Sequence, residues 1–443
     1  MRQHHRPISK KILFGSCAAL CLPLLAQEPL PTTDWDAEIL GPSLFESAAI
    51  ETRSLDVAEP VSEPVVILSG GEQPRASRWR VAPHLDLTAS WDDNIFIQPT
   101  NATADFVFTL EPGIALGFWD VEERLEHFLD REHRASAINR GPGNFLLLDY
   151  TAILLGFEKT SSENSLDHDA RIEAQWQLAR LTLGAAFHAD SKSQKSSDVG
   201  GRVRRKALAS ELTARYQLTE KTSLEVSLFN VIQDFEGLLR SNEWRTENYL
   251  DYQLTPLAHV AVGLALGRVE VESGADQVFE RILARALYSL TEKVEIEAHG
   301  GVEFRQSDGE AGDHVNPVFH VTARYEPAAG TRIGLEAYRR VETSAFQPDQ
   351  AYTLTGIALK ITRALAGGMH LSLAGGFELA DYTESPQLPG RTDHYYFVRP
   401  GLLYNFAQWG NAEVSYEYRQ NDSSRPDSSF ENNVVSVRAS LIY

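Results

Sequence analysis

Apolar and polar residues alternate one by one along many stretches of this sequence. In residues 294–305, apolar or small residues take the even positions and polar residues the odd ones, apart from Gly301. The same alternation returns in the ranges 171–178, 211–216, 332–342 and 412–419. A period of two is that of a β-strand with one apolar and one polar face, and it excludes a helical solenoid. The pattern therefore predicts an all-β protein made of amphipathic strands.

A short phrase recurs between these strands. The chain reads YQLTEKTSLEV at 216–226, YQLTPLAHVAV at 252–262 and YSLTEKVEIEA at 288–298, with a spacing of 36 residues. Each version is an aromatic strand end, a tight turn and a new strand. Variants of this plan lie at 176–186, 325–335, 361–373 and 404–414. The repeat therefore predicts seven turns of one kind in a long antiparallel meander.

The opposite strand ends lead into polar stretches, which we expect to be longer loops: 191–202, 306–314, 381–390 and 420–429. Short turns at one rim and longer loops at the other are typical of outer-membrane β-barrels. In such a barrel the repeated Trp or Tyr lies where hydrocarbon meets the lipid headgroups. The alternative is a soluble β-sandwich or propeller, but its core would not need charged residues at every second position of nearly every strand.

The strand count follows from the connections. A first strand is expected near 79–91 and its return near 104–118. The connection 119–144 has Val121, Leu125 and Phe128 at helical spacing, which predicts a periplasmic insert with a short amphipathic helix. This insert and the seven repeated turns make eight periplasmic connections. With one strand before the first and one after the last, the prediction is a transmembrane antiparallel barrel of about 18 strands.

The N-terminal part of the chain has a different composition. Residues 1–26 combine basic residues with a short apolar core, which predicts a signal peptide; the two cysteines, Cys17 and Cys21, both lie in it. Lipidation of either cysteine is the weaker alternative, because neither has the expected residues before it. Residues 27–77 hold six prolines, ten acids and two arginines, which predicts a disordered acidic periplasmic tail. The barrel then occupies 78–443, and the tail is a spacer or the binding site of a periplasmic partner.

The C-terminal end also favours the outer membrane. The last residues, NNVVSVRASLIY, place apolar side chains on one face of a strand that ends in the aromatic Tyr443. Such a strand resembles the signal by which the barrel assembly machinery recognises its substrates. The expected partners are therefore this machinery and outer-membrane lipid. The formal net charge of −20 argues against nucleic acid as a partner.

Three fragments of the first third resemble the putative β-barrel porin family of Gram-negative outer-membrane proteins. The first fragment is Asp92, Asp93, Asn94, Ile95 and Phe96, the second is Pro112 and Gly113, and the third is Leu148, Asp149 and Tyr150. The resemblance covers about 79–443 and implies a barrel in the outer membrane. Some relatives are associated with export of extracellular polysaccharide, so the resemblance leaves a porin and an exporter open.

The polar faces of the strands predict the lining of a pore. The lining residues expected with their signs are acidic Glu173, Glu211, Glu295, Glu297, Glu303, Glu336, Glu413 and Glu417, and basic Arg171, Arg215, Arg305, Arg332, Arg340 and Arg438. Since many of these charges can pair across strands, we expect a hydrated wall with a weak preference for cations. The alternative is a barrel whose lumen is filled by its loops or by the 119–144 insert.

Chemistry of other kinds finds little support in the sequence. Asp92, Asp93 and Asn94 could contribute ligands to a calcium ion, but three adjacent oxygens do not make a full set, so we expect them to order the first outer loop. His127 and His133 are six residues apart on the predicted helix and so lie on different faces, which argues against a shared zinc ion. No motif of a hydrolase, metalloprotease, redox dithiol or phosphate loop occurs. We therefore expect no metal, no cofactor, no catalytic residue and no enzyme. The expected function is a porin-like diffusion pore for small hydrophilic solutes, and the alternative is polysaccharide export or an envelope anchor.

Overall fold

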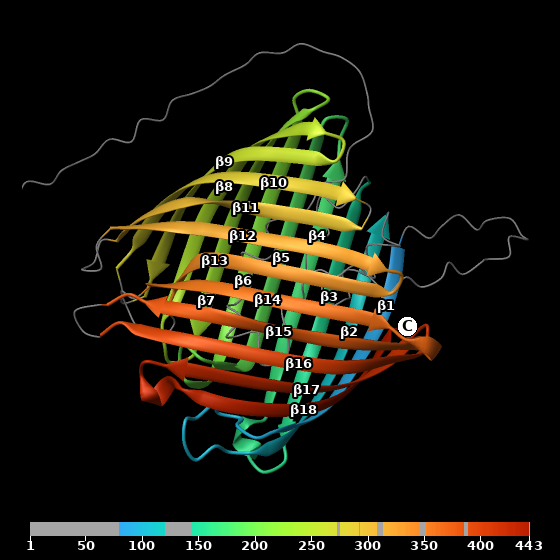
Figure 1. Cartoon of the computed structure of the whole chain (residues 1–443), viewed down its shortest axis with the longest axis vertical. Coiled ribbons are helices and arrows are strands. Elements are labelled where there is room, and N and C mark those ends of the chain that lie inside the picture. Colours follow the sequence, from blue (N-terminus) through green and yellow to red (C-terminus); the bar gives the residue numbers. More distant parts are fainter. Residues whose placement is uncertain are drawn as a thin grey trace, which may run out of the picture.

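The computed structural model describes residues 79–119, 143–272, 275–291, 293–307, 313–344, 351–384 and 389–442 (Figure 1). These residues form 18 antiparallel strands in one sheet, in which each strand pairs with its neighbours along the chain. The sheet closes on itself because β1 also pairs with β18. The predicted closed barrel and its number of strands are therefore confirmed.

The strands are β1 (Trp79–Asp92), β2 (Asp105–Trp119), β3 (Phe145–Phe157), β4 (Ser165–Gln177), β5 (Leu181–Ser196), β6 (Gly201–Gln217), β7 (Thr222–Phe235), β8 (Arg240–Thr255), β9 (Ala258–Val271), β10 (Gln277–Thr291), β11 (Val294–Ser307), β12 (His314–Ala328), β13 (Thr331–Thr343), β14 (Ala351–Ala364), β15 (Met369–Tyr382), β16 (Arg391–Ala407), β17 (Gly410–Ser423) and β18 (Phe430–Ile442). Single 3₁₀ turns lie in three connections: η1 (Ser161–Glu163), η2 (Ala366–Gly368) and η3 (Pro426–Ser428). No helix within these described ranges is long and apolar enough to cross a membrane.

Several predicted segments lie outside the described residues. These are the signal peptide 1–26, the tail 27–77, the terminal Tyr443 and all but the ends of the 119–144 insert with its predicted helix. They stay predictions.

The seven repeated phrases form seven short turns at one end of the barrel, which we call the turn end. The connecting residues are 178–180, 218–221, 256–257, 292–293, 329–330, 365–368 and 408–409. In the three closest copies, the threonine of the phrase accepts a hydrogen bond from the backbone N–H two residues later, at distances of 3.1–3.2 Å. The pairs are Lys221 to Thr219, Leu257 to Thr255 and Lys293 to Thr291. The repeat is therefore a repeated turn, stabilised by a side chain that replaces a backbone acceptor.

The opposite end, which we call the loop end, differs from the prediction. The polar stretch 191–202 is mostly strand, because β5 continues to Ser196 and β6 begins at Gly201. Likewise β17 continues through Ser423, well into the stretch 420–429 that was expected to be a loop. The prediction of long loops at these places was wrong because their strands are polar on both faces, so hydropathy gives no sign of them.

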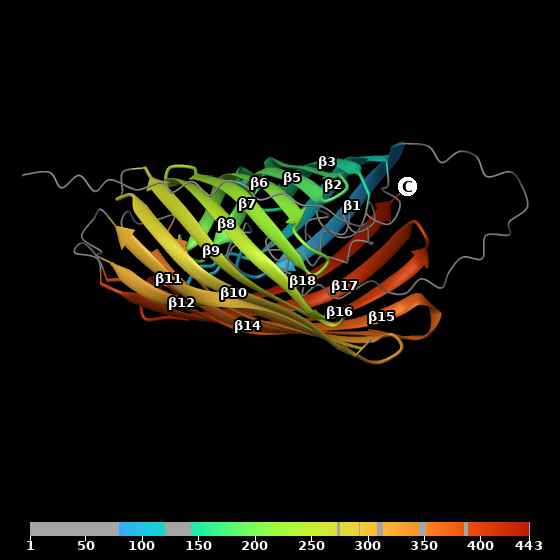
Figure 2. The same ribbon diagram turned by 90° about the horizontal axis from the view of Figure 1, so that it is seen from above.

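The barrel is flattened rather than round. Seen edge-on, β2–β7 form one broad wall and β12–β17 the facing wall (Figure 2). The outward side is apolar along the middle of the strands: Val262, Leu264 and Ile282 are 64%, 59% and 60% exposed. The repeated aromatic residues at the turn end are also exposed, as shown by Trp176 at 54% and Tyr252 at 46%. The inward side carries most of the charged residues, which are buried, so the barrel is apolar outside and polar inside.

Candidate functional site

The inner face of β4–β11 is lined by ion pairs, and we call it the ionic wall. At its centre Arg285 of β10 reaches two acids on other strands. Its Nη1 donates to Glu225 Oε1 of β7 at 3.0 Å, and its Nη2 to Asp251 Oδ1 of β8 at 2.9 Å. Glu225 is also 3.5 Å from Arg215 of β6. One guanidinium thus connects three strands of the wall, and charged pairs of this kind replace the apolar core of a soluble protein.

A second chain of pairs continues the ionic wall toward the loop end. Glu303 of β11 is fully buried and accepts from Arg281 Nε and from Arg305 Nε, both at 2.7 Å. Arg245 of β8 lies 2.7 Å from Glu247, which is 1% exposed. Arg281 also lies 3.9 Å from Glu247, so that the pairs of β8, β10 and β11 are connected. Acids and bases thus face one another in this chain of pairs.

Aromatic rings support these guanidinium groups. The Arg285 guanidinium lies 4.2 Å from the centre of the Tyr249 ring, and Arg281 lies 4.6 Å from that of Phe279. Each ring covers a glycine on the neighbouring strand: a Cβ added at Gly263 would meet Tyr249 at 2.5 Å, and one at Gly267 would meet Phe279 at 2.1 Å. The glycine lets the ring lie flat on the wall, and the ring face then attracts the cation.

The residues predicted to line the pore all lie on the inward side, and none of the fourteen is exposed. The structure brings most of them into pairs. Among themselves they form Arg171–Glu173 at 3.1 Å and Arg305–Glu303 at 2.7 Å. Three pair with further residues that the alternation also places on the polar face: Arg215 with Glu225, Arg340 with Glu342, and Glu417 with Arg419 at 3.7 Å. The others contact residues not singled out from the sequence: Glu295 with Arg324, Arg332 with Glu326, Glu336 with His320, Glu413 with Arg399, Arg438 with Asp86, and Glu211 with Thr213. Glu297 lies on the same face of β11 as Glu303 and also has an interaction.

The inner face of β13–β16 is different near the loop end, and we call it the aromatic wall. Its core contains Leu354, Ala380 and Phe397 with four buried tyrosines, Tyr338, Tyr352, Tyr382 and Tyr395. Tyr352 and Tyr382 stack with their ring centres 4.5 Å apart. Ile97, from the connection after β1, packs into the same cluster. This wall is therefore packed mainly by rings, and charged groups lie against them, as in the contacts of Arg391 with Tyr382 and of Arg340 with Tyr338.

Part of the β5–β6 hairpin leaves the barrel wall. The pairing of β4 with β5 ends at His168 and Ser191, and that of β6 with β7 ends at Arg205 and Phe235. Beyond these points the two strands pair only with each other, up to Ser196 and Gly201. We call residues 192–203 the arm. Because it is free of both neighbouring ladders, the arm can bend away from the wall.

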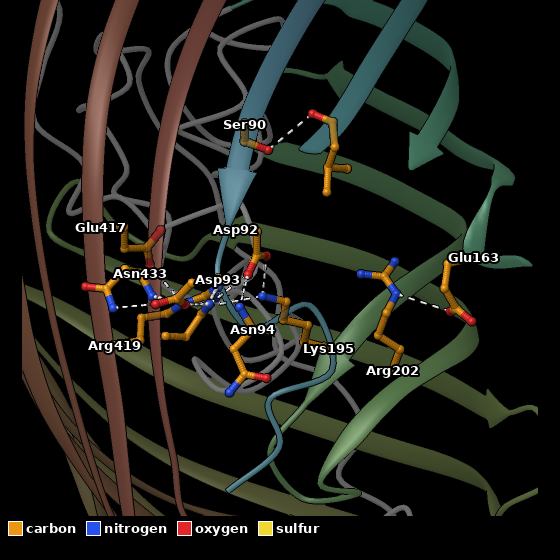
Figure 3. Close-up of polar contacts among 12 residues, drawn as sticks. Ser90, Asp92, Asp93, Asn94, Glu163, Lys195, Arg202, Glu417, Arg419 and Asn433 are labelled. Carbon is orange, nitrogen blue, oxygen red and sulfur yellow. Dashed lines mark hydrogen bonds and ion pairs between the residues drawn. The ribbon is translucent and has the colours of Figure 1, made fainter. Parts of the chain in front are cut away.

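The tip of the arm contacts strands that are distant in the order of the sheet (Figure 3). Lys195 Nζ donates to Asp92 Oδ2 of β1 at 2.5 Å and to Asn432 Oδ1 of β18 at 3.1 Å. On the other side, Asp198 accepts from Ser344 Oγ at 3.0 Å and lies 3.9 Å from Arg391 of β16. Residues 195–198 are at most 7% exposed. The arm therefore crosses the interior and is held at its tip by opposite charges on two sides.

The family-motif residues lie beside the arm and are fully engaged. Asp92 accepts from Lys195 and Asn432, and Asp93 and Asn94 bond residues at the start of β18. Ile95 is completely buried with Val107, Leu155 and Phe157, and Phe96 packs against this cluster. In the described part of the chain, no group of three or more His, Cys, Asp or Glu side chains is placed to hold a metal ion.

The other two fragments of the family resemblance meet at the turn-end half of the barrel. His84 Nε2 of β1 lies 2.8 Å from Asp149 Oδ1 of β3, although β2 runs between these strands. The contact is possible because Gly113 of β2 has no side chain: a Cβ there would lie 2.1 Å from the imidazole. Pro112 and Gly113 thus belong to a three-strand contact, in which the glycine leaves room for a polar bridge.

Several residues of the site were not found from the sequence. Arg281 and Arg285 share a face of β10, but Leu283 and Leu287 lie on that face too and hide the alternation. Lys195 and Asp198 were assigned to a loop. The inward tyrosines break the rule of polar residues inside, and for Tyr249 and Tyr338 the room is made by a glycine on the next strand. A strand register supplies that position, and the sequence alone does not.

A closed antiparallel barrel with an apolar outside and a charged inside defines the class of transmembrane β-barrels. Residues 286–442 match the family model described as Putative beta-barrel porin 2, which confirms the porin-family resemblance predicted from the sequence. The match does not include the fragments at 92–96, 112–113 and 148–150, so their status as family residues stays a prediction. None of the curated proteins compared matches the chain.

Several solved structures are similar to this chain at low identity. Pseudomonas aeruginosa OpdK, crystallised with vanillate, has a TM-score of 0.41 and 11% identity, covering 82% of this chain and 99% of its own. Pseudomonas aeruginosa OccK3 (OpdO) has a TM-score of 0.42 and 11% identity, covering 82% and 95%. Acinetobacter baumannii OccAB4 has a TM-score of 0.43 and 10% identity, covering 82% and 98%.

Proposed function

We propose that this protein is an outer-membrane channel, a porin-like pore through which small hydrophilic solutes diffuse passively. The observation that carries the proposal is the closed 18-stranded sheet with apolar residues outward and paired charges inward, in a chain that matches a porin family. A barrel of this strand number encloses an aqueous lumen unless something fills it. The exposed apolar band contacts lipid, and the turn end faces the periplasm.

The arm sets the width of this pore. It leaves the wall after Ser191, crosses the interior and is fixed by Lys195 on one side and Asp198 on the other. Solutes therefore pass beside the arm and along the ionic wall, whose acids and bases form pairs. Paired charges attract water but select weakly between ions, so we expect a slight preference for cations.

The proposal is tested by reconstitution of the purified protein in planar bilayers. We expect stepwise conductance with a reversal potential slightly toward the cation value. In a shortened variant, Asn-Gly replaces Gln194–Val203 and forms a two-residue turn between the paired residues Ser193 and Arg204. Its single-channel conductance should rise severalfold. Arg425→Ala combined with Asp427→Ala is the matched control, because this pair lies exposed at the loop end and does not touch the arm.

The opposite result has a clear meaning. Circular dichroism shows whether the unaltered protein and the shortened variant are folded. If both are folded and neither conducts at several salts and voltages, passive diffusion is excluded. The function would then be the alternative one, in which the barrel exports or anchors a polymer of the envelope. If both conduct equally, the protein is a channel but the arm does not set its width.

Outer-membrane localisation and assembly are tested separately. The protein should fractionate with the outer membrane and migrate differently on gels before and after heating. Removal of Tyr443 should lower the amount of the folded form, because the assembly machinery is proposed to recognise the last strand. An undiminished amount of folded, membrane-inserted protein would contradict that role.

A further inference from the structure

The first and last strands meet along a short seam. β1 and β18 share nine register pairs, from His84 with Ile442 to Asp92 with Val434. The other partner of each strand is held by a longer ladder, with fourteen pairs between β1 and β2 and twelve between β17 and β18. The seam joins residues more than 340 positions apart in the chain, and without it two strand edges would remain unpaired. The barrel therefore needs the seam to close, but the β1–β18 ladder contributes only a few backbone pairs to that closure.

The alternation of residues does not define the register of this seam. A shift by one residue would turn the apolar face of β18 inward and is excluded by burial. A shift by two residues would keep every side chain on its proper face. The outward residues of β18 are similar to one another, namely Val435, Val437, Ala439 and Leu441, and they oppose Trp91, Ala89, Leu87 and Leu85. Register must therefore be set by residues with more specific contacts.

Such contacts occur at the loop end of the seam, between Asp92–Asn94 and residues 431–433 (Figure 3). Asn433 donates to Asp93 twice, from its backbone N at 2.7 Å and from Nδ2 at 2.6 Å. Asn432 Nδ2 donates to Asp92 Oδ1 at 2.7 Å and to Asp93 Oδ1 at 3.0 Å. Asn94 Nδ2 donates to the carbonyl of Glu431 at 3.0 Å. Asp92, Asp93 and Asn94 thus each accept or donate a hydrogen bond within residues 431–433.

These bonds are sensitive to register because they are short, charged and buried. Asn94 and Asn432 are 1% and 0% exposed. A shift by two residues would leave the carboxylates of the buried Asp92 and the half-buried Asp93 without these donors. A hydrogen bond that an amide donates to a charged carboxylate is stronger than one between two neutral groups. A buried acceptor that loses its donor is also costly.

We infer that Asp92–Asn94 and residues 431–433 form a seam latch, which selects the register in which β1 and β18 close the barrel. The latch also prepares the place where the arm docks. Lys195 binds Asp92 of one edge strand and Asn432 of the other, so its site is complete only after correct closure. The fixed arm is thus a product of the closed seam, and this inference does not depend on what the barrel transports.

The test measures register by disulfide formation in the full chain, with Cys17 and Cys21 replaced by alanine. Cysteines at Ala89 and Val437 report the native register, because these exposed residues are partners. Cysteines at Ala89 and Val435 report a shift by two residues. The latch is removed by Asp93→Ala with Asn432→Ala. The matched control is Asp422→Ala, which removes an exposed carboxylate on the neighbouring β17 that accepts a hydrogen bond from Gln420 Nε2 at 2.9 Å.

With the latch intact, the native pair should form the disulfide and the shifted pair should not. Loss of the latch should lower the ratio of native to shifted yield roughly tenfold, the change expected for lost charge-assisted hydrogen bonds. The control should leave the ratio unchanged. An unchanged ratio in the latch variant would overturn the inference. If that variant fails to assemble, Asn433→Ala removes one donor of Asp93 and is read in the same way, and an unchanged ratio there also overturns it.

Discussion

The ionic wall and the aromatic wall fill the inside of the same flattened barrel with different chemistry. On the ionic wall, Arg285 connects Glu225 and Asp251, and charges are paired both between strands and within them, as in Arg245 with Glu247. On the aromatic wall, Tyr338, Tyr352 and Tyr382 pack with Leu354 into a compact core. Paired charges hold water and are sensitive to the loss of one partner, whereas packed rings exclude water and are sensitive to volume. The difference separates the face along which we expect solutes to move from the face that supports the arm.

The largest effect should come from breaking the centre of the ionic wall. Arg285→Leu leaves Glu225 and Asp251 buried without this donor, and loss of one partner of a buried pair costs about 3–5 kcal/mol. The measurement is the free energy of unfolding in detergent, followed by circular dichroism in denaturant. Arg268→Ala is the control, because its side chain is 56% exposed and such exposed ion pairs contribute about 0–1 kcal/mol. Equal free energies of unfolding for the two variants would show that water, rather than the Arg285 guanidinium, satisfies the carboxylates of the ionic wall.

A middle-sized effect should come from crowding the aromatic wall. A Cβ added at Gly356 would lie 2.4 Å from the ring of Tyr338, so Gly356→Ala should cost about 1–3 kcal/mol through overpacking. Tyr338→Leu in the same chain should recover part of this loss, because it removes the clashing ring. Gly201→Ala serves as the control, since nothing lies within 4 Å of its Cβ. Additive effects of the two substitutions at 356 and 338 would contradict the contact.

The smallest effect should appear in ion selectivity. Glu295 and Arg324 form a 3.6 Å pair in which each side chain is about one third exposed, at 34% and 33%. Glu295→Gln should move the reversal potential slightly toward the anion value, and Arg324→Gln should move it slightly toward the cation value. Measurements in a salt gradient across a planar bilayer test the two variants against each other. Shifts in the same direction would show that these charges do not face the permeating ions.

The sequence predicts the ladder of this barrel well, because period-two alternation and turn residues are local signals. β1 and β2 lie within one residue of their predicted bounds, and the phrases with Thr219, Thr255 and Thr291 mark their turns. Alternation also places Glu303 and Glu336 on the inward face. Local signals do not define the strand register or the contacts between side chains on distant strands. The contact of His84 with Asp149 across Gly113 requires three aligned strands, and that of Lys195 with Asp92 requires the arm to leave the wall.

The arm has a consequence for how such a protein can change over generations. Residues 192–203 share no ladder with β4 or β7, so insertions, deletions and exchanges there do not disturb the alternation of any wall strand. Only Lys195 and Asp198 must find opposite charges at the far side. A dozen consecutive codons can therefore be rewritten as a unit while the remaining strands keep their sequence. The barrel is a frame with an exchangeable insert, and new permeability can arise without a new fold.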